Sequence, residues 1–234
     1  MDNERLKGTV LTVPRARWRE AQVEELEYAR QNMRAGDDWN EWWYNQFDQY
    51  KAIVGRRFGN VLEAGCGPHT NIRYLRSRVA TGRVYLEDPL IDHYLAYNAG
   101  LFGRRPFVQE ITDAEYTACP LEDLVYRDGM MDVVICINVL DHVQDYDRCM
   151  AEMDRVLASG GILILGQDLS NGEDMANCPE SYTDIAHPIK VDLDNLKESL
   201  KCYTPVFERI LPRERGRNPK CHYGTYLGIL QKVY

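Results

Sequence analysis

The sequence predicts an α/β fold in which helices cover one mostly parallel sheet and a helical segment precedes that sheet. Strand-like and helix-like signals alternate from Val61 onward, which favours parallel strands joined by right-handed crossovers. Residues 131–137 are β-branched and apolar at nearly every position, as in a strand that is buried on both faces. A chain of 234 residues is long enough for one such domain with an appendage, but not for two full-sized domains.

The N-terminal segment carries two helical patterns. Residues 15–35 place apolar side chains on one helical face, and Gly36 ends that pattern. Asp37 or Asp38 can cap a second helix that runs from Trp39 towards Val54. This second helix has aromatic residues at almost every angular position: Trp39, Trp42, Trp43, Tyr44, Phe47 and Tyr50. Such a helix must be covered on more than one side, so it is a hydrophobic cap on the sheet, a lid over a ligand, or both. We therefore divide the chain into a cap or lid, residues 1–54, and a main domain, residues 55–234.

The remaining elements follow from periodicity and from turn residues. The pattern predicts strands at 61–64, 84–87, 131–137 and 162–166, helices at about 69–79, 91–100, 146–157 and 192–203, and two last strand-like runs at 204–211 and 223–233. Residues 107–111 are predicted as a short strand or a loop, and residues 112–118 as a helical turn. Residues 170–179 have the composition of a surface loop.

The chain is organised around the glycine-spaced turn that follows its first strand. Gly65 allows a sharp turn, and Gly67 allows the backbone to approach a ligand with no Cβ in the way. The dinucleotide fingerprint has a third glycine three residues after Gly67, where this chain has Thr70. This departure argues against a nicotinamide or flavin site.

The segment Glu63-Ala64-Gly65-Cys66-Gly67 resembles the first motif of class I S-adenosylmethionine-dependent methyltransferases. Asp88 closes the next strand about twenty residues later, and residues 121–134, 138–143 and 155–161 are similar to later segments of that family, in the same order. The resemblance covers roughly residues 55–168. It implies a Rossmann-like sheet with an antiparallel last strand, and S-adenosylmethionine as cosubstrate.

The resemblance also implies a set of residues that bind the cosubstrate: Glu63, Ala64, Gly65, Cys66, Gly67, Asp88, Pro89, Leu121, Glu122 and Asn138. Glu63 would face the amino group of the methionine part, or else cap the turn. Asp88 would accept hydrogen bonds from the ribose hydroxyls. The family commonly has an acidic residue at the position of Pro120, so here Glu122 or Asp123, or the backbone of Leu121 and Glu122, would hold the adenine.

The residues that follow the fourth predicted strand are the catalytic candidates. His142 can accept a proton from a hydroxyl acceptor near neutral pH, and Asp141 precedes it. His187 is the second candidate base. Asp141 and Asp168 end adjacent strands and could hold a divalent cation together, but two carboxylates are weak evidence, and we predict no metal ligands.

Composition limits the partners of the chain. A formal net charge of −8 argues against a general affinity for nucleic acids, and the basic cluster Arg213, Arg215, Arg217 and Lys220 is interpreted as a solvated hairpin tip. Seven cysteines without a Cys-x-x-Cys pair indicate reduced thiols, and no apolar run is long enough to cross a bilayer. We expect a cytoplasmic monomer or homodimer that binds no membrane.

The predicted function is methylation of an oxygen on a small polar or sugar-type acceptor. The alternatives are a non-catalytic subunit that binds S-adenosylmethionine, and an N-methyltransferase that acts on a small molecule or an RNA base.

Overall fold

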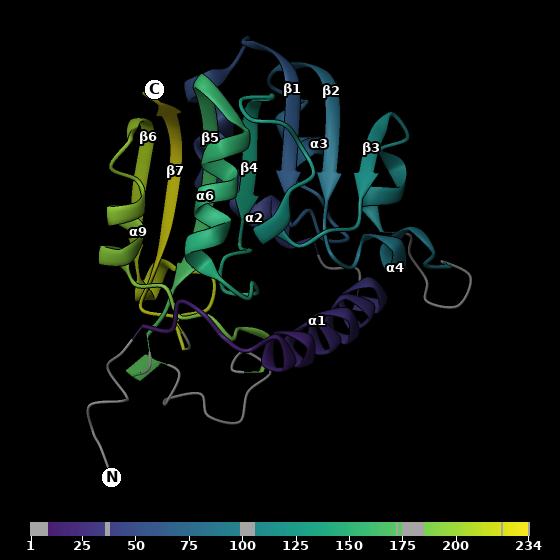
Figure 1. Ribbon diagram of the computed structural model, residues 1–234, viewed down its shortest axis with the longest axis vertical. Coiled ribbons are helices and arrows are strands. Elements are labelled where there is room, and N and C mark those ends of the chain that lie inside the picture. The colour runs from purple at the N-terminus through teal and green to yellow at the C-terminus, as the bar shows by residue number, and fades with distance from the viewer. Residues whose placement is uncertain are drawn as a thin grey trace.

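The computed structural model describes residues 9–35, 38–98, 106–171, 173–174, 185–220 and 222–233, and within them a seven-stranded sheet of order β3-β2-β1-β4-β5-β7-β6 (Figure 1). The strands are β1 (Arg57–Ala64), β2 (Ala80–Glu87), β3 (Ala114–Thr117), β4 (Met131–Ile137), β5 (Leu157–Leu169), β6 (Tyr203–Pro212) and β7 (Gly224–Lys232). The first five pair in parallel, and β7 is antiparallel to both β5 and β6. The predicted fold class is confirmed.

Helices cover both faces of the sheet and divide the core into two layers. They are α1 (Arg15–Ala35), α2 (Trp39–Gln46), α3 (Ile72–Leu75), α4 (Ile91–Leu95), α6 (Tyr146–Val156) and α9 (Leu193–Ser199), with short 3-10 turns η1 (Asp48–Ile53), η2 (Phe107–Glu110), η3 (Leu121–Asp123) and η4 (Arg213–Arg215). Side chains of α6 and α9 pack on one face with Leu62 and Val134, while those of α2, η1, α3 and α4 pack on the other with Val61 and Val133. Neighbouring residues of β1 and β4 therefore enter opposite layers, as alternation in a strand requires.

The segment at 112–118 was predicted with the wrong type, and the helix that begins at Trp39 with the wrong end. Residues 112–118 contain the edge strand β3, which pairs with residues 84–87, and not a helical turn. The helix of aromatic residues that begins at Trp39 ends at Gln46. The chain then turns in η1, where Asp48, Gln49 and Tyr50 have positive φ angles. Because Phe47 and Tyr50 are fully buried, this turn brings both rings into the core. Asp38, one of the two predicted caps, accepts a hydrogen bond from the backbone N–H of Asn40.

The predicted helices at 69–79 and 91–100 are much shorter in the structure, as α3 and α4. Residues 99 and 100 lie outside the described part of the chain, as does most of the predicted loop at 170–179. The helix at 15–35 and the strand at 131–137 have their predicted bounds, and residues 107–110 form the 3-10 turn η2. The other predicted strands and helices are present with shifted ends.

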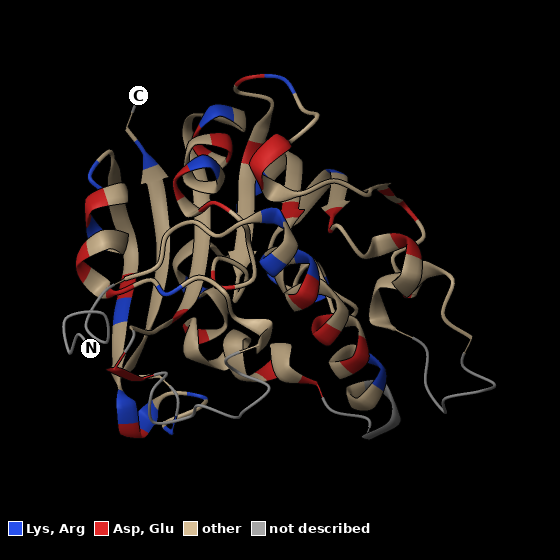
Figure 2. Ribbon diagram, turned by 60° about the horizontal axis from the view of Figure 1, so that its bottom comes forward, with Lys and Arg blue, Asp and Glu red and all other residues tan. Residues whose placement is uncertain are grey.

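Helix α1 lies across the edge of the sheet where the parallel strands end (Figure 1). This edge also carries Gly65 after β1, Asp88 after β2 and Asn138 after β4. Figure 2 shows acidic and basic residues mixed along α1, whereas the strands are mostly uncharged. No helix in the described part of the chain is long and apolar enough to cross a membrane. The fold therefore gathers polar side chains from several elements beneath α1.

Candidate functional site

Two adjoining cavities open at this edge of the sheet, with volumes of about 410 Å³ and 140 Å³. Six residues line both of them: Glu25, Gly65, Gly67, Pro68, Asn138 and His142. The larger cavity extends under α2 towards Arg217, and the smaller one extends along the ends of β2 and η3. The glycine turn and His142 thus lie where the two cavities meet.

The two glycines of the turn have the conformations that the sequence requires. Gly65 and Gly67 have φ angles of +65° and +55°, which L side chains rarely adopt. A Cβ at Gly65 would lie 2.5 Å from Cγ1 of Val139, whereas a Cβ at Gly67 would have no neighbour within 4 Å. The close packing at Gly65 is therefore internal to the protein, while the space beside Gly67 is open to a ligand.

Glu63 stabilises the turn from within. Its carboxylate is 1% exposed, lines neither cavity, and accepts hydrogen bonds from the backbone N–H groups of Asn71 (2.6 Å) and Ile72 (3.0 Å), and from the hydroxyl of Thr70. Burial raises the pKa of Glu63, and these hydrogen bonds oppose that rise. The structure therefore places Glu63 in the capping role, which was one of the two expected for it.

Two acidic residues at the end of β2 face the smaller cavity. Asp88 accepts hydrogen bonds from the backbone N–H groups of Gly67 (2.9 Å) and Leu90 (2.8 Å), and burial raises its pKa to about 6. Glu87 was not predicted, yet it lines the same cavity and is fully buried, and its Oε1 has no hydrogen-bond partner in the described part of the chain. Burial and the neighbouring Asp88 raise the pKa of Glu87 well above its usual value. An unpartnered buried carboxyl oxygen in a cavity indicates a polar ligand there.

The segment predicted to hold the adenine forms one wall of the smaller cavity. Pro120, Leu121 and Glu122 line it, whereas the side chain of Asp123 is exposed. Oε1 of Glu122 accepts hydrogen bonds from the backbone N–H groups of Gln144 (2.6 Å) and Asp145 (3.0 Å). The position therefore favours Glu122 and the backbone over Asp123 as partners of an adenine ring.

The remaining predicted cosubstrate residues differ in their access to the cavities. Asn138 lines both cavities, and its buried Oδ1 has no hydrogen-bond partner among the described groups; Pro89 lines the smaller cavity. Cys66 lines the larger cavity, but burial raises the pKa of its thiol well above the usual value, which leaves it protonated. Ala64 is fully buried and lines neither cavity, so only its backbone helps to shape the turn.

His142 contacts both α1, which lies across the edge of the sheet, and Asp141, which follows β4. Its Nδ1 lies 3.2 Å from Oε1 of Glu25, on α1, and 3.1 Å from the carbonyl oxygen of Ala186, and its Nε2 lies 3.7 Å from Oδ1 of Asp141. Burial alone would lower the pKa of His142, but Glu25 and Asp141 raise it above its ordinary value. Trp18 and Gln22, also on α1, donate hydrogen bonds to the backbone oxygen of His142.

Asp141 lies close to His142 and His187, and His187 in turn contacts His222. Nε2 of His187 is 3.6 Å from Oδ2 of Asp141, the rings of His142 and His187 are 4.3 Å apart, and the ring of His222 is 5.9 Å from that of His187. Burial favours the neutral carboxyl group, but the three histidines hold the pKa of Asp141 well below its usual range. The structure thus brings all three predicted catalytic residues together.

One group of three metal-ligand side chains exists among the described residues. Glu25, His142 and His187 place one ligand atom each within 4.8 Å of one another. The pair considered from the sequence, Asp141 and Asp168, is not part of this group.

Part of the chain is similar to a known family of proteins. Residues 62–165 match a family described as a methyltransferase domain. This match begins at the end of β1, includes the glycine turn, and ends in β5. Residues 62–165 are less than half of the chain, and over this segment the chain is similar to methyltransferase domains.

The curated relatives of this chain are named for methylation of different kinds of atom. The chain is 31% identical to a human thiol S-methyltransferase over 127 residues, which are 53% of this chain and 49% of that protein. It is 30% identical to ajmaline N-methyltransferase from Rauvolfia serpentina over 111 residues, which are 46% of this chain and 30% of that protein. The chain thus spans half the length or less of these curated relatives.

A solved structure extends the similarity of fold to the whole chain. The 1,6-didemethyltoxoflavin-N1-methyltransferase of Burkholderia thailandensis, solved with S-adenosylhomocysteine and its acceptor, matches with a TM-score of 0.57 and 19% identity. The match covers 100% of this chain and 98% of that one.

Four residues of the candidate site were not predicted from sequence. Glu87 has the plainest signal, since it directly precedes the predicted ribose ligand Asp88 at the end of a strand. Glu25 is one of several acidic residues on α1, and nothing in its spacing singles it out. Trp39 was assigned only to the aromatic helix and Arg217 only to a solvated tip, yet both line the larger cavity.

Proposed function

We propose that this protein transfers a methyl group from S-adenosylmethionine to a hydroxyl oxygen of a small polar molecule, such as a sugar-type acceptor. The observation that carries the proposal is His142, which lies where the two cavities meet and is held between two carboxylates. A base at that junction can reach an acceptor in the larger cavity and the reacting end of a cosubstrate in the smaller one.

The residues of the smaller cavity fit the cosubstrate. The backbone of Gly65 and Gly67 would hold the methionine part, Asp88 and Glu87 the ribose, and Leu121 and Glu122 the adenine, with Asn138 near the reacting end. When bound, S-adenosylmethionine would supply a methyl group on a sulfonium, whose carbon an oxygen nucleophile can attack while the thioether leaves. The chain itself must align the acceptor and exclude water.

His142 would take the proton that the acceptor hydroxyl loses. In the tautomer that carries hydrogen on Nδ1, this nitrogen is oriented by Oε1 of Glu25 and by the carbonyl oxygen of Ala186, and Nε2 is the basic atom. Once Nε2 is protonated, Asp141 stabilises the imidazolium from 3.7 Å. The new bond joins the acceptor oxygen to the methyl carbon, the sulfur–carbon bond breaks, and the proton remains on His142.

Replacement of His142 by Ala tests the assignment. We expect turnover with labelled cosubstrate to fall about a hundredfold or more, because general-base catalysis contributes on that scale. Affinity for S-adenosylhomocysteine, measured by calorimetry, should stay near that of the unchanged protein. His93→Ala is the matched control, since His93 is an exposed histidine of α4. If the His142→Ala variant keeps its turnover, His142 is not the base.

The assays are run after dialysis against EDTA and again with added Zn²⁺, since Glu25, His142 and His187 resemble a metal ligand set. A base needs no metal, so turnover should be the same in both. If activity appears only with Zn²⁺, His142 is a metal ligand and not a base.

N-methylation of a small amine is the second candidate. It is favoured by the relative from Rauvolfia serpentina, whose name gives it N-methyltransferase activity. Protonated amines also need a base before they can react, so His142 would keep its role. Parallel assays with amine and hydroxyl acceptors separate the two candidates.

A further inference from the structure

Arg217 is held at one end of the larger cavity by two tryptophan rings. It lies between η4 and β7, and its side chain is 18% exposed, in contrast to the solvated position expected from its sequence. Its guanidinium carbon lies 5.0 Å from the ring centre of Trp39 and 5.6 Å from that of Trp43. Contacts of this kind fix a guanidinium in place without using its N–H groups.

The hydrogen-bonding capacity of this guanidinium is unused within the described part of the chain. The closest charge is Oδ2 of Asp168 at 3.6 Å, which is too long for a hydrogen bond, and no described group accepts one from Arg217. Asp168 is fully buried, and its Oδ1 accepts a hydrogen bond from the hydroxyl of Thr225 at 2.7 Å. Arg217 therefore presents several N–H donors to a cavity that it lines.

A second donor without a partner lies in the same place. Nε1 of Trp39 is buried and has no hydrogen-bond partner among the residues that the structure describes, and Trp39 lines the same cavity. Indole N–H and guanidinium groups donate hydrogen bonds but cannot accept them. Buried donors of this kind are normally satisfied, so this end of the cavity is suited to a ligand group that only accepts.

The chemistry of that group follows from the shape and charge of its surroundings. A planar guanidinium matches a carboxylate, which can accept two parallel hydrogen bonds. Asp168 already balances part of the charge on Arg217, so a single negative charge suits the site better than the double charge of a phosphate.

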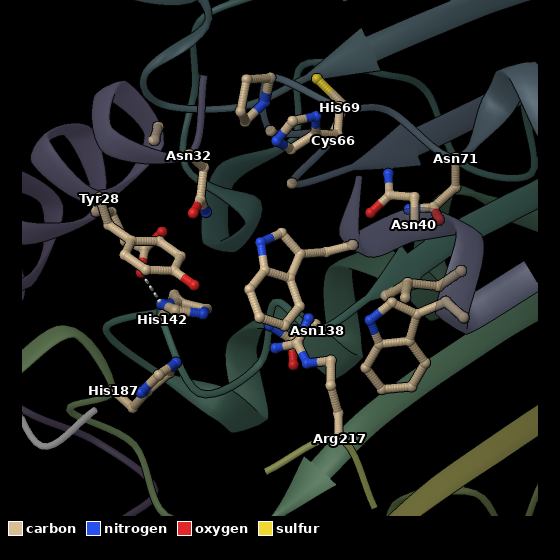
Figure 3. A pocket seen from close by; sticks show the side chains of 18 of the residues that line it. Tyr28, Asn32, Asn40, Cys66, His69, Asn71, Asn138, His142, His187 and Arg217 are labelled. Carbon is tan, nitrogen blue, oxygen red and sulfur yellow. Dashed lines mark ion pairs between the residues drawn. The ribbon is translucent and has the colours of Figure 1, made fainter. Parts of the chain in front are cut away.

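The position of Arg217 indicates which molecule carries the carboxylate. In Figure 3, Cys66 and His69 of the glycine turn approach the cavity from one side, and Arg217 reaches in from the opposite side. His142 and His187 lie on a third side. The methionine part of the cosubstrate belongs at the glycine turn, so Arg217 faces the space that remains for the acceptor.

We propose that the methyl acceptor is a hydroxy acid, whose carboxylate binds to Arg217 and Trp39 while its hydroxyl group faces His142. This inference rests on the proposed function and adds a charged group to its substrate.

The experiment measures binding, so it does not depend on turnover. A set of probes, 3-hydroxybenzoate, 4-hydroxybenzoate and 4-hydroxyphenylacetate, each paired with its uncharged amide, is titrated by calorimetry into the protein saturated with S-adenosylhomocysteine. We expect at least one acid to bind tenfold or more tightly than its amide. That preference should vanish in Arg217→Gln, weaken in Arg217→Lys, and persist in Arg215→Gln, which removes an exposed positive charge from η4.

The variants are chosen to separate binding from folding. Arg217→Gln leaves the buried Asp168 without its cation and can lower stability, whereas Arg217→Lys keeps the positive charge but lacks the planar fork. Thermal unfolding of each variant shows whether it is folded at the temperature of the titration. If the acid preference is weaker in a folded Arg217→Lys as well as in Arg217→Gln, the result supports the subsite.

Three results would overturn the inference. The first is that no acid binds tenfold more tightly than its amide, and the second is that the preference persists in Arg217→Gln. The third is that Arg217→Lys weakens S-adenosylhomocysteine but not 5′-methylthioadenosine, which lacks the methionine carboxylate; Arg217 would then hold the cosubstrate. Failure of the proposed function gives a different outcome, because then S-adenosylhomocysteine would not bind to the unchanged protein or no labelled methyl group would be transferred.

Discussion

Acidic residues at the ends of neighbouring strands have different roles because their hydrogen-bond partners differ. Glu63 directs its carboxylate to N–H and O–H groups of residues 70–72, so it supports the turn. Glu87 has one oxygen without a partner in the smaller cavity, so it is available to a ligand. Asp141 lies against three histidines that keep it ionised. All three are almost fully buried, so exposure alone does not separate structural from functional acids.

Gly67→Ala tests whether open space beside the turn serves the cosubstrate. In the folded protein the new methyl group meets no atom within 4 Å, so the cost in stability is that of a positive φ angle, about 1 kcal/mol. The methyl group would stand where the backbone must approach the ligand, and we expect the affinity for S-adenosylhomocysteine to fall at least tenfold in calorimetry. Gly55→Ala is the control, since Gly55 also has a positive φ angle and open space but lines neither cavity. Equal affinity in the two variants would contradict the assignment.

At the residue scale, the sequence predicts what depends on local backbone and fails for what depends on distant partners. Gly65 and Gly67 were predictable because a sharp turn after a strand demands residues that tolerate positive φ. Arg217 was not, because its burial depends on Trp39 and Trp43, more than 170 positions earlier in the chain. A run of basic residues near a proline has the same composition whether it faces solvent or a cavity.

At the scale of elements, α1 supplies a carboxylate to a histidine that follows β4. Trp18 and Gln22 hold this helix to the backbone of His142, and Glu25 reaches the ring of the same residue. The charge state of His142 is thereby coupled to the position of α1. This coupling gives a physical basis for the predicted role of the N-terminal segment as a lid.

Glu25→Gln should shift the pH dependence of activity. A base must be neutral, so kcat/KM rises with pH through the pKa of His142, which Glu25 and Asp141 hold above its ordinary value. Loss of the Glu25 charge removes the larger of these two effects, so the acidic limb of the kcat/KM profile should move to lower pH. Glu27→Gln is the control, because Glu27 lies on the exposed side of the same helix. If the acidic limb of the kcat/KM profile does not move in Glu25→Gln, a group other than His142 determines that limb.

The elements that were predicted wrongly share a cause. The four residues of β3 include Glu115 and Thr117, and a strand so short and polar gives no clear alternation. Its pairing with β2 is decided by the sheet, not by its own sequence. Likewise, the aromatic pattern after Trp39 is compatible with a longer helix, and it is the burial of Phe47 and Tyr50 that ends α2 at Gln46. By contrast, β4 was predicted with its observed bounds because it is apolar on both faces.

At the scale of the whole molecule, the two parts of the N-terminal segment relate differently to the core. Among the described side chains of α1, few apolar ones are buried, namely Ala21 and Ala29. The region of α2 and η1 buries Trp43, Phe47, Tyr50 and Ile53 to 1% exposure or less, in one cluster with β1, β4 and β7. Trp43 also packs on β5, where a Cβ at Gly166 would lie 2.9 Å from its ring. The predicted boundary at residue 54 thus separates segments that share a core.

Two truncations distinguish a lid from a part of the core. Removal of residues 1–37 takes away α1 with Glu25, so we expect a cooperative thermal transition at a lower temperature, with turnover lost. Removal of residues 1–54 also deletes three buried aromatic side chains, and because each contributes about 3–5 kcal/mol, their sum approaches the 5–15 kcal/mol by which such a domain is stable. That chain should show no cooperative transition in calorimetry and no native near-ultraviolet circular dichroism. A folded protein lacking residues 1–54 would mean that the sheet and its other helices are sufficient, and that the aromatic segment is an appendage after all.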